Sequence, residues 1–241
     1  DIDQDMVDFA RRDPVMRRLN HNALSDRRGS VPPAGGVAAG GVRALYQETG
    51  ETRTGEKGHP VPETVMTAMV NILHLDADKF VETARGKYNV ILVDFPDPGS
   101  IELAKLYSRE FYLKLSHVLS EKGMVAVQAT SPYHAKEAFL CIVRTMEAAG
   151  FATLPYHDNV PSFGDWGWIL AWKKQAMTRK TVENRVASMD IGVKTRYISP
   201  EVFKSALVFG KGRLESRNRE INTLMHPVIL DLYTREGWKI D

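Results

Sequence analysis

The sequence has few of the features that mark disulfide-bonded, zinc-binding or membrane-spanning proteins. Its 241 residues include one cysteine, Cys141, which excludes an internal disulfide and suits a reducing compartment. Seven histidines are scattered without the Cys/His spacing of a zinc site, so we expect no metal. No apolar run approaches the ~20 residues that cross a bilayer, and no signal peptide is visible.

An excess of charge of either sign is also lacking. The chain has 32 Lys+Arg and 30 Asp+Glu residues, for a net charge of +2. This balance gives no general argument for binding to nucleic acid or to a membrane surface. The basic residues between 173 and 185 are more typical of a solvated face, so we expect no nucleic-acid partner.

What the sequence does contain is an alternation of strand and helix patterns. Strands are predicted over 71–76, 88–94, 124–128, 152–157 and 166–172, and helices over 108–123 and 135–149. Such alternation predicts a doubly wound α/β fold with a mostly parallel sheet. No helix separates the last two strands, so they should form an antiparallel pair at the sheet edge. Ser108 is the predicted cap of the first helix, and Gly123 its predicted end.

The same patterns divide the chain into an α/β domain over 1–172 and a helical extension over 173–241. Within the first part, residues 28–62 are rich in proline, glycine and polar side chains. Such a composition buries little apolar surface, so this range is predicted to be a flexible insertion.

Acidic residues follow three of the expected strands. They are Asp1 and Asp3, Asp76 and Asp78, and Asp94 and Asp97. In open α/β sheets, ligands bind beyond the carboxyl ends of the strands, where an acid can hold ribose hydroxyls. Aspartate is also a common helix cap and turn residue, and for any one of these acids that alternative stays open. Three successive strand ends together favour a nucleoside site.

Two of the acids lie in a turn rich in proline, Asp94-Phe95-Pro96-Asp97-Pro98. The prolines leave two carboxylates, three residues apart, with little backbone freedom. Both could converge on one cation. A carboxylate beside a bound amine can hold its ammonium form or take its proton. A divalent metal is the competing idea, but no further carboxylates cluster nearby in the sequence.

The residues around this turn resemble the signature of the polyamine aminopropyltransferases, the spermidine synthase-like family. Residues 93–98 match a strand that ends in Asp-x-x-Asp-Pro, and residues 106–112 match Leu-Tyr-Thr/Ser-x-Glu-Phe-Tyr. Residues 127–132, 160–164 and 195–203 also look like family blocks. They are most similar to the bacterial branch whose full-length members carry membrane helices before the catalytic domain.

The resemblance implies an amine site. Asp94 matches the catalytic acid, and Asp97 matches the acid that holds the substrate amine. Gln128 matches a glutamine of the amine pocket, and Phe163 stands where many relatives have a substrate-contacting tyrosine. Phe163 could instead be a loop aromatic on the sheet edge. Tyr107 could belong either to the pocket wall or to the core face of its helix.

The resemblance also implies a site for the co-substrate, decarboxylated S-adenosylmethionine. Asp1 would bind the ribose hydroxyls and Asp78 the adenine, with Lys79 in place of the usual small residue. The family's Gly-Gly-Gly-Asp-Gly loop has no counterpart here. The implied Rossmann-like S-adenosylmethionine-dependent transferase fold, a partial catalytic domain over 1–172, would therefore be incomplete at its N-terminus.

We accordingly expect transfer of an aminopropyl group to putrescine or a related polyamine, which gives spermidine and methylthioadenosine. An S-adenosylmethionine-dependent methyltransferase and a truncated, non-catalytic binding module are the alternatives, and the activity of this chain alone is open. The expected location is the cytoplasmic face. The chain could form a homodimer, and its parent protein could be membrane-anchored through an upstream segment.

Overall fold

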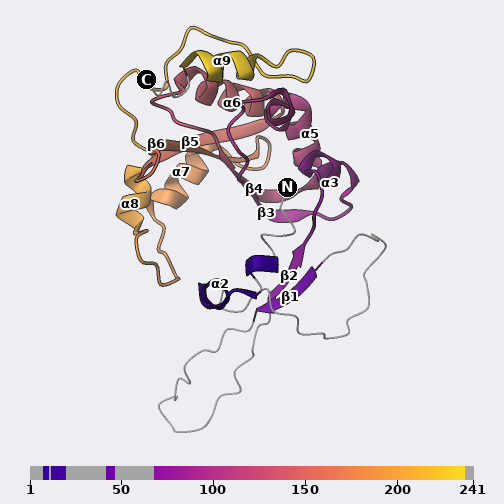
Figure 1. The fold of residues 1–241 in the computed structure, drawn as a ribbon. Coiled ribbons are helices and arrows are strands. Elements are labelled where there is room, and N and C mark those ends of the chain that lie inside the picture. The colour runs from indigo at the N-terminus through magenta and orange to yellow at the C-terminus, as the bar shows by residue number, and fades with distance from the viewer. Residues whose placement is uncertain (1–7, 11, 20–41, 47–67, 237–241) are drawn as a thin grey trace. The chain divides into compact units, whose positions relative to one another are not determined.

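The chain divides into two compact units, Asp1–Lys79 and Phe80–Asp241. The computed structural model describes residues 8–10, 12–19, 42–46 and 68–236, which Figure 1 draws as a coloured ribbon. None of the helices in these ranges combines the length and hydropathy that a membrane crossing requires.

The first unit contains a short helix and a two-stranded sheet. Helix α2 (Pro14–Leu19) follows Asp13, whose carboxylate accepts hydrogen bonds from the backbone N–H groups of Val15 and Met16, at 2.9 Å each. Strand β1 (Val42–Tyr46) pairs antiparallel with β2 (Ala68–Ile72).

One prediction for the first unit needs correction, and another is not tested. Residues 42–46, inside the predicted insertion 28–62, form a strand, since Val-Arg-Ala-Leu-Tyr is a good strand sequence within a polar stretch, and the flexibility of the insertion stays a prediction. The rest of that range lies outside the described residues. The strand predicted over 71–76 ends at Ile72 and pairs with β1 rather than with a parallel sheet. Helix α3 (Ala77–Thr83) begins soon after it.

The second unit is built on a four-stranded sheet in the order β3-β4-β6-β5. Its strands are β3 (Tyr88–Val93), β4 (Leu119–Gln128), β5 (Phe151–Val160) and β6 (Gly164–Lys173). Strands β3 and β4 are parallel, whereas β6 is antiparallel to both β4 and β5. The predicted antiparallel edge pair is therefore confirmed.

The connection from β3 to β4 contains α4 (Ile101–Ala104), the 3-10 turn η1 (Lys105–Tyr107) and α5 (Arg109–Val118). Ser108 caps α5 as predicted, because its Oγ accepts the N–H of Phe111 at 3.2 Å. The predicted end at Gly123 is wrong. The helix stops at Val118, and Gly123 lies inside β4, where an added Cβ would be 2.6 Å from the Leu119 Cδ1.

Helices lie on both faces of the sheet, so the α/β fold class is confirmed (Figure 1). The sheet is mixed rather than mostly parallel, because β3 and β4 form the one parallel pair among the four strands. On one face α5 and α6 (Lys136–Ala148) pack over β4, β5 and β6, and α9 (Val228–Glu236) packs on α6. On the other face α7 (Arg179–Ala187) packs on β5, and α8 (Pro200–Ser205) packs on α7. Residues 173–236 thus join the same compact unit as the sheet. The predicted division at 172/173 stays a prediction.

Alternating residues of the sheet supply its two apolar faces. Val125, Val127, Ile169 and Ala171 are buried with the aromatic and aliphatic residues of α5 and α6. Trp172, from the opposite face, clusters with Leu154 of β5 and Val182 of α7. Since Val93 of β3 pairs with Val127 of β4, the next residues, Asp94 and Gln128, share the carboxyl edge of the sheet.

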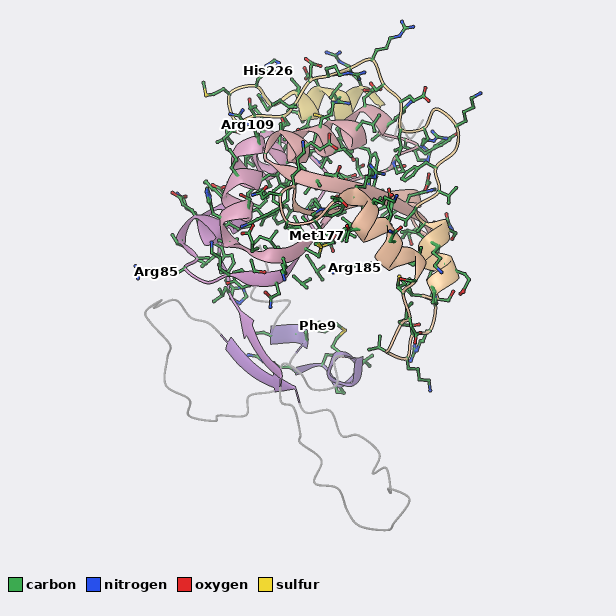
Figure 2. The ribbon with its side chains drawn as sticks, turned by 180° about the vertical axis from the view of Figure 1, so that it is seen from behind. Phe9, Arg85, Arg109, Met177, Arg185 and His226 are labelled. Atoms are coloured by element: carbon green, nitrogen blue, oxygen red, sulfur yellow. The ribbon has the colours of Figure 1, made fainter. Side chains whose placement is uncertain are left out.

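The C-terminal segment is held against this core by buried hydrogen bonds. Asn222 has no exposed surface, and its amide donates to the Ala104 carbonyl at 2.8 Å while its backbone N–H donates to the Thr145 hydroxyl at 2.9 Å. The Arg109 N–H donates to the Asn222 carbonyl at 2.9 Å. Figure 2 shows Arg109 and His226 toward the same end of the unit. These bonds fix the start of α9 relative to α4, α5 and α6.

Candidate active site

The two acids of the proline-rich turn have different surroundings. Asp94 directly follows β3 and is exposed, and no described residue donates a hydrogen bond to its carboxylate. Asp97 is half-buried, and its Oδ1 accepts a hydrogen bond from the Gln128 Nε2 at 2.8 Å. Its Oδ2 accepts one from the Thr130 Oγ1 at 3.0 Å and one from the Tyr233 hydroxyl at 3.0 Å. One acid faces solvent, whereas three neutral side chains orient the other.

The turn itself is short and pinned at both ends. Pro98 is buried, and the Gly99 N–H donates to the Asp97 carbonyl at 2.7 Å. Ser100 then caps α4, because its Oγ accepts the Leu103 N–H at 3.3 Å. These local contacts of the turn therefore restrict the position of Asp97, in addition to its long-range hydrogen bonds.

Gln128 connects Asp97 to Tyr107. Its side chain is 6% exposed, and while Nε2 donates to Asp97, Oε1 accepts from the Tyr107 hydroxyl at 3.1 Å. A carboxylate only accepts hydrogen bonds, so the amide nitrogen must face Asp97, and this assigns the orientation of the amide. The resemblance implied an amine pocket with Asp97 and Gln128 and left Tyr107 between the pocket wall and the core face of its helix, and the structure brings the three residues into one hydrogen-bonded network.

Tyr107 lies beneath this network rather than on its surface. It has no exposed area, and its single proton is shared among Gln128 Oε1 and the carbonyls of Pro96, at 3.0 Å, and Phe95, at 3.3 Å. Burial, and then the charges of Asp97 and Asp94, raise the pKa of Tyr107 well above its ordinary value, so the hydroxyl stays a neutral donor. The predicted contact with substrate stays a prediction, and the observed contacts favour a supporting position.

Thr130 reaches Asp97 through an unusual backbone conformation. It is buried and has a φ of 60°, a region that costs a residue with a Cβ about 1 kcal/mol or more. Strand β6 holds this bend, because Gly167 donates to the Thr130 carbonyl at 2.8 Å and accepts from Ala129 at 2.9 Å. No side chain fits at position 167 without a shift of its neighbours, since a Cβ added to Gly167 would lie 2.6 Å from the Phe139 ring. The strained bend directs the Thr130 hydroxyl at Asp97.

Phe163 lies in the turn of the β5–β6 hairpin, where its N–H donates to the Val160 carbonyl at 2.9 Å. Its side chain is 53% exposed, and its ring centroid is 5.1 Å from that of Trp166. Because β4 pairs with β6 only from Gly167 onward, the hairpin tip extends past the carboxyl edge of β4. Phe163 is thus near the edge that carries the acids, and its predicted role in the amine pocket stays a prediction.

The three residues predicted to bind the nucleoside, Asp1, Asp78 and Lys79, belong to the first unit. Asp1 is outside the described residues. In this unit the Asp76 carboxylate caps α3 by accepting the N–H groups of Asp78 at 2.8 Å and Lys79 at 3.3 Å. Their roles stay predictions.

A depression of about 370 Å³ lies elsewhere in the second unit. Its polar lining consists of Glu82, Arg85, Lys87, Lys114 and His117. These residues surround the amino ends of β3 and β4, opposite the edge that carries Asp94 and Gln128. Two of the cations already have partners within the chain: Lys114 pairs with Glu82 at 3.6 Å, and Lys87 donates to the His117 carbonyl. This depression is not part of the acid network.

Sequence reasoning missed two partners of Asp97, Thr130 and Tyr233. Thr130 lies within a segment that resembled a family block, but its hydroxyl carried no local signal. Tyr233 is 136 residues away from Asp97 in the chain, in a segment that showed only a helical pattern. Neither contact could be inferred without the tertiary structure.

The arrangement is suited to binding a cation and moving a proton. Asp97 presents a fixed, half-buried negative charge, and Asp94 presents an exposed carboxylate that can accept a proton. Burial raises the pKa of the Cys141 thiol, so that residue is a poor candidate for a thiolate nucleophile. In the described part of the chain, His, Cys, Asp and Glu side chains form no group of three or more that could hold a metal ion.

Comparison with known proteins identifies relatives. The family described as Spermine/spermidine synthase domain matches residues 62–184. Polyamine aminopropyltransferase 1 of Streptomyces coelicolor is 38% identical over 168 residues, which cover 70% of this chain and 30% of that protein. The polyamine aminopropyltransferase of Shewanella oneidensis is 45% identical over 125 residues, which cover 50% of this chain and 21% of that protein. The chain thus spans less than a third of the length of these two curated relatives.

A solved structure also aligns with the chain. Spermidine synthase from Thermotoga maritima is 21% identical and superposes with a TM-score of 0.47 over 58% of this chain and 48% of that one.

Proposed function

Since the chain belongs to the spermine/spermidine synthase domain family, we propose that the full-length protein transfers an aminopropyl group from decarboxylated S-adenosylmethionine to putrescine or a related polyamine. The products would be spermidine and methylthioadenosine. The observation that carries the proposal is the acid pair at the carboxyl edge of the sheet, with Asp94 exposed and Asp97 held by three donors. A site of this kind attracts cations, and both substrates of the reaction are cationic.

The reaction is a displacement at carbon. The lone pair of a neutral amine forms a C–N bond to the propyl carbon next to the sulfonium, the C–S bond breaks, and its electron pair stays on sulfur. The new C–N bond leaves the nitrogen positively charged, and one N–H proton then departs. Free diamines are almost wholly protonated at neutral pH, since an alkyl amine has a pKa near ~10.4. The site must therefore supply the neutral amine at one end of the substrate while it binds an ammonium at the other.

The two acids would divide this work. Asp94 would accept the amine proton or orient the attacking nitrogen, because it is exposed and no described side chain occupies its carboxylate. Asp97 would hold an ammonium group, because its charge is fixed in direction by Gln128, Thr130 and Tyr233. Holding both reactants in place removes much of the cost of a bimolecular encounter.

The remaining roles follow from position. Gln128 and Tyr107 would position Asp97 and the turn, and Phe163 would form part of the wall of the amine site through its ring. Asp1, Asp78 and Lys79 would contact the nucleoside of the co-substrate. A homodimer, a location on the cytoplasmic face and a membrane-anchored parent protein are further predictions.

The nucleoside product tests the proposal. We would incubate the full-length protein with putrescine and either decarboxylated or ordinary S-adenosylmethionine, and identify the nucleoside by mass spectrometry. Methylthioadenosine from the decarboxylated co-substrate is the expected result, and the Asp94→Asn variant is the control for background cleavage. Adenosylhomocysteine would indicate methyl transfer instead, and the absence of both products would indicate a binding module.

A further inference from the structure

We propose that Tyr233, on the C-terminal helix α9, determines which cations Asp97 accepts. By saturating one carboxylate oxygen, Tyr233 leaves room for a single ammonium donor and excludes the two-point contact of a guanidinium. The inference rests on the proposed function for the assignment of Asp97 as the amine-binding acid, and it adds a specificity-determining residue to that site.

The argument starts from the acceptor capacity of the carboxylate. An ionised carboxylate has two oxygens with about four lone-pair sites in total. Thr130 and Tyr233 both donate to Oδ2, so the two sites of that oxygen are filled. Among the described residues Gln128 alone donates to Oδ1, so they leave one site of that oxygen unused. Asp97 can therefore accept one further hydrogen bond, and only through Oδ1.

This remaining capacity discriminates between two classes of cation. An alkyl ammonium is a point charge that can donate one N–H to a single oxygen. A guanidinium binds a carboxylate most strongly through two parallel N–H groups, one to each oxygen. With Oδ2 saturated, the second of these bonds has no acceptor. The described geometry thus favours an alkyl diamine over a guanidino amine of similar length.

Tyr233 is held firmly enough to impose this selection. Its ring lies beside the turn that carries Asp97, since a Cβ added at Gly99 would be 3.7 Å from the Tyr233 Cε1. The buried side chain of Asn222 fixes the start of its helix by bonding Ala104 and by accepting the Ile229 N–H at 3.4 Å. The hydroxyl is therefore directed at Asp97 by packing of the whole C-terminal segment.

The protonation state of Tyr233 is also suited to this role. Burial, followed by the neighbouring charge of Asp97 and their hydrogen bond, raises the pKa of Tyr233 to about 12. The phenol consequently stays protonated at neutral pH and can only donate to the carboxylate. Tyr233 therefore keeps its hydrogen bond to Asp97 Oδ2 at neutral pH.

Binding measurements on the full-length protein test the proposal. We would measure the affinities for putrescine and for 4-guanidinobutylamine, in which a guanidine replaces one amine, by isothermal titration calorimetry in the presence of methylthioadenosine. The Tyr233→Phe variant frees one site on Oδ2, so its affinity ratio should move toward the guanidine by about tenfold or more. The Thr130→Gly variant removes the other donor while tolerating the positive φ, and its ratio should move the same way.

Tyr197→Phe is the matched control. Tyr197 also donates its hydroxyl to an aspartate, Asp158 at 3.3 Å, but it is 63% exposed and belongs to no part of the acid network. Its removal should leave the affinity ratio unchanged.

One outcome would overturn the inference: an affinity ratio that stays unchanged in both Tyr233→Phe and Thr130→Gly. This includes an equal loss of affinity for both ligands, because a merely structural role would weaken both alike. The product assay on the unmodified protein is separate. If it yields methylthioadenosine while the ratio does not move, the inference fails and the proposed function stands. If it yields no product and neither amine binds, both fail.

Discussion

Two aspartates of a single turn, Asp94 and Asp97, have the same chemistry and opposite surroundings. Asp94 is exposed, and no described side chain donates to it, whereas Asp97 is half-buried and accepts three side-chain hydrogen bonds. Three residues of backbone are enough to move a carboxylate from solvent into a network that draws on β4 and α9. The surroundings, and not the residue type, therefore distinguish the two carboxylates, and the separate roles proposed for Asp94 and Asp97 rest on this difference.

Of the substitutions that test this comparison, Asp94→Asn in the full-length protein should have the largest effect, which is on turnover. The substitution removes the proton acceptor but no described hydrogen bond, so turnover should fall by about 10²–10⁴-fold while the melting temperature stays close to that of the unmodified protein. Steady-state kinetics and a thermal melt measure the two quantities. Near-normal turnover would remove Asp94 from its proposed role.

Asp97→Asn should give a different profile. The loss of the fixed charge should raise the KM for the amine by about tenfold or more, since hydrogen bonds between charged groups contribute roughly 1.5–3 kcal/mol. The new amide also turns donors toward Gln128 or Thr130, so the melting temperature should fall. Kinetics with the amine varied, together with calorimetry, test both parts. A variant with an unchanged KM and an unchanged melting temperature would contradict the division of roles between the two acids.

Tyr107→Phe tests whether this buried residue supports the acid network or contacts the substrate. The variant removes the buried donor of the Pro96 carbonyl and leaves Gln128 Oε1 with the longer hydrogen bond from the Thr130 N–H, at 3.4 Å, so the free energy of unfolding should fall by about 1–3 kcal/mol. Because Tyr107 has no exposed surface, the KM for the amine should change less than in Asp97→Asn. Urea unfolding and amine-dependent kinetics decide the matter. A large change in KM with unchanged stability would instead favour the sequence-based prediction that Tyr107 contacts substrate.

The smallest effect should be that of Tyr233→Phe on the free energy of unfolding, and it should appear only at alkaline pH. The folded protein raises the pKa of Tyr233 from its ordinary value of 10.0 to about 12, so the folded state binds that proton more tightly than the unfolded state. This contribution to the free energy of unfolding is complete below about pH 10 and is lost as the pH rises toward about 12. Urea unfolding across this range should show a shallower decline in Tyr233→Phe. The variant keeps the other tyrosines whose pKa the fold raises, which are Tyr107, Tyr112, Tyr156 and Tyr197. Parallel curves would show that the Tyr233–Asp97 bond is absent in solution.

Much of the fold could be predicted because its signals are local. The strands β3 to β6 and the helices α5 and α6 follow from hydrophobic periodicity, and Ser108 caps α5 where its sequence context indicated. The error at Gly123 has a physical reason. A glycine commonly ends a helix, but here it allows the backbone of β4 to lie against the Leu119 side chain, a requirement that depends on packing.

The sequence by itself determined the acids, the prolines that restrict their turn and the glutamine at the end of the next strand, because each is a property of a short segment. Only the tertiary structure decided how these groups are used. The contacts of Asp97 with Thr130 and Tyr233 span 33 and 136 residues of chain. They exist because a strained bend after β4 and the packing of α9 bring two hydroxyls to one oxygen. A hydroxyl has no periodic or compositional signature that reveals its partner, so the saturation of that oxygen is a consequence of packing alone.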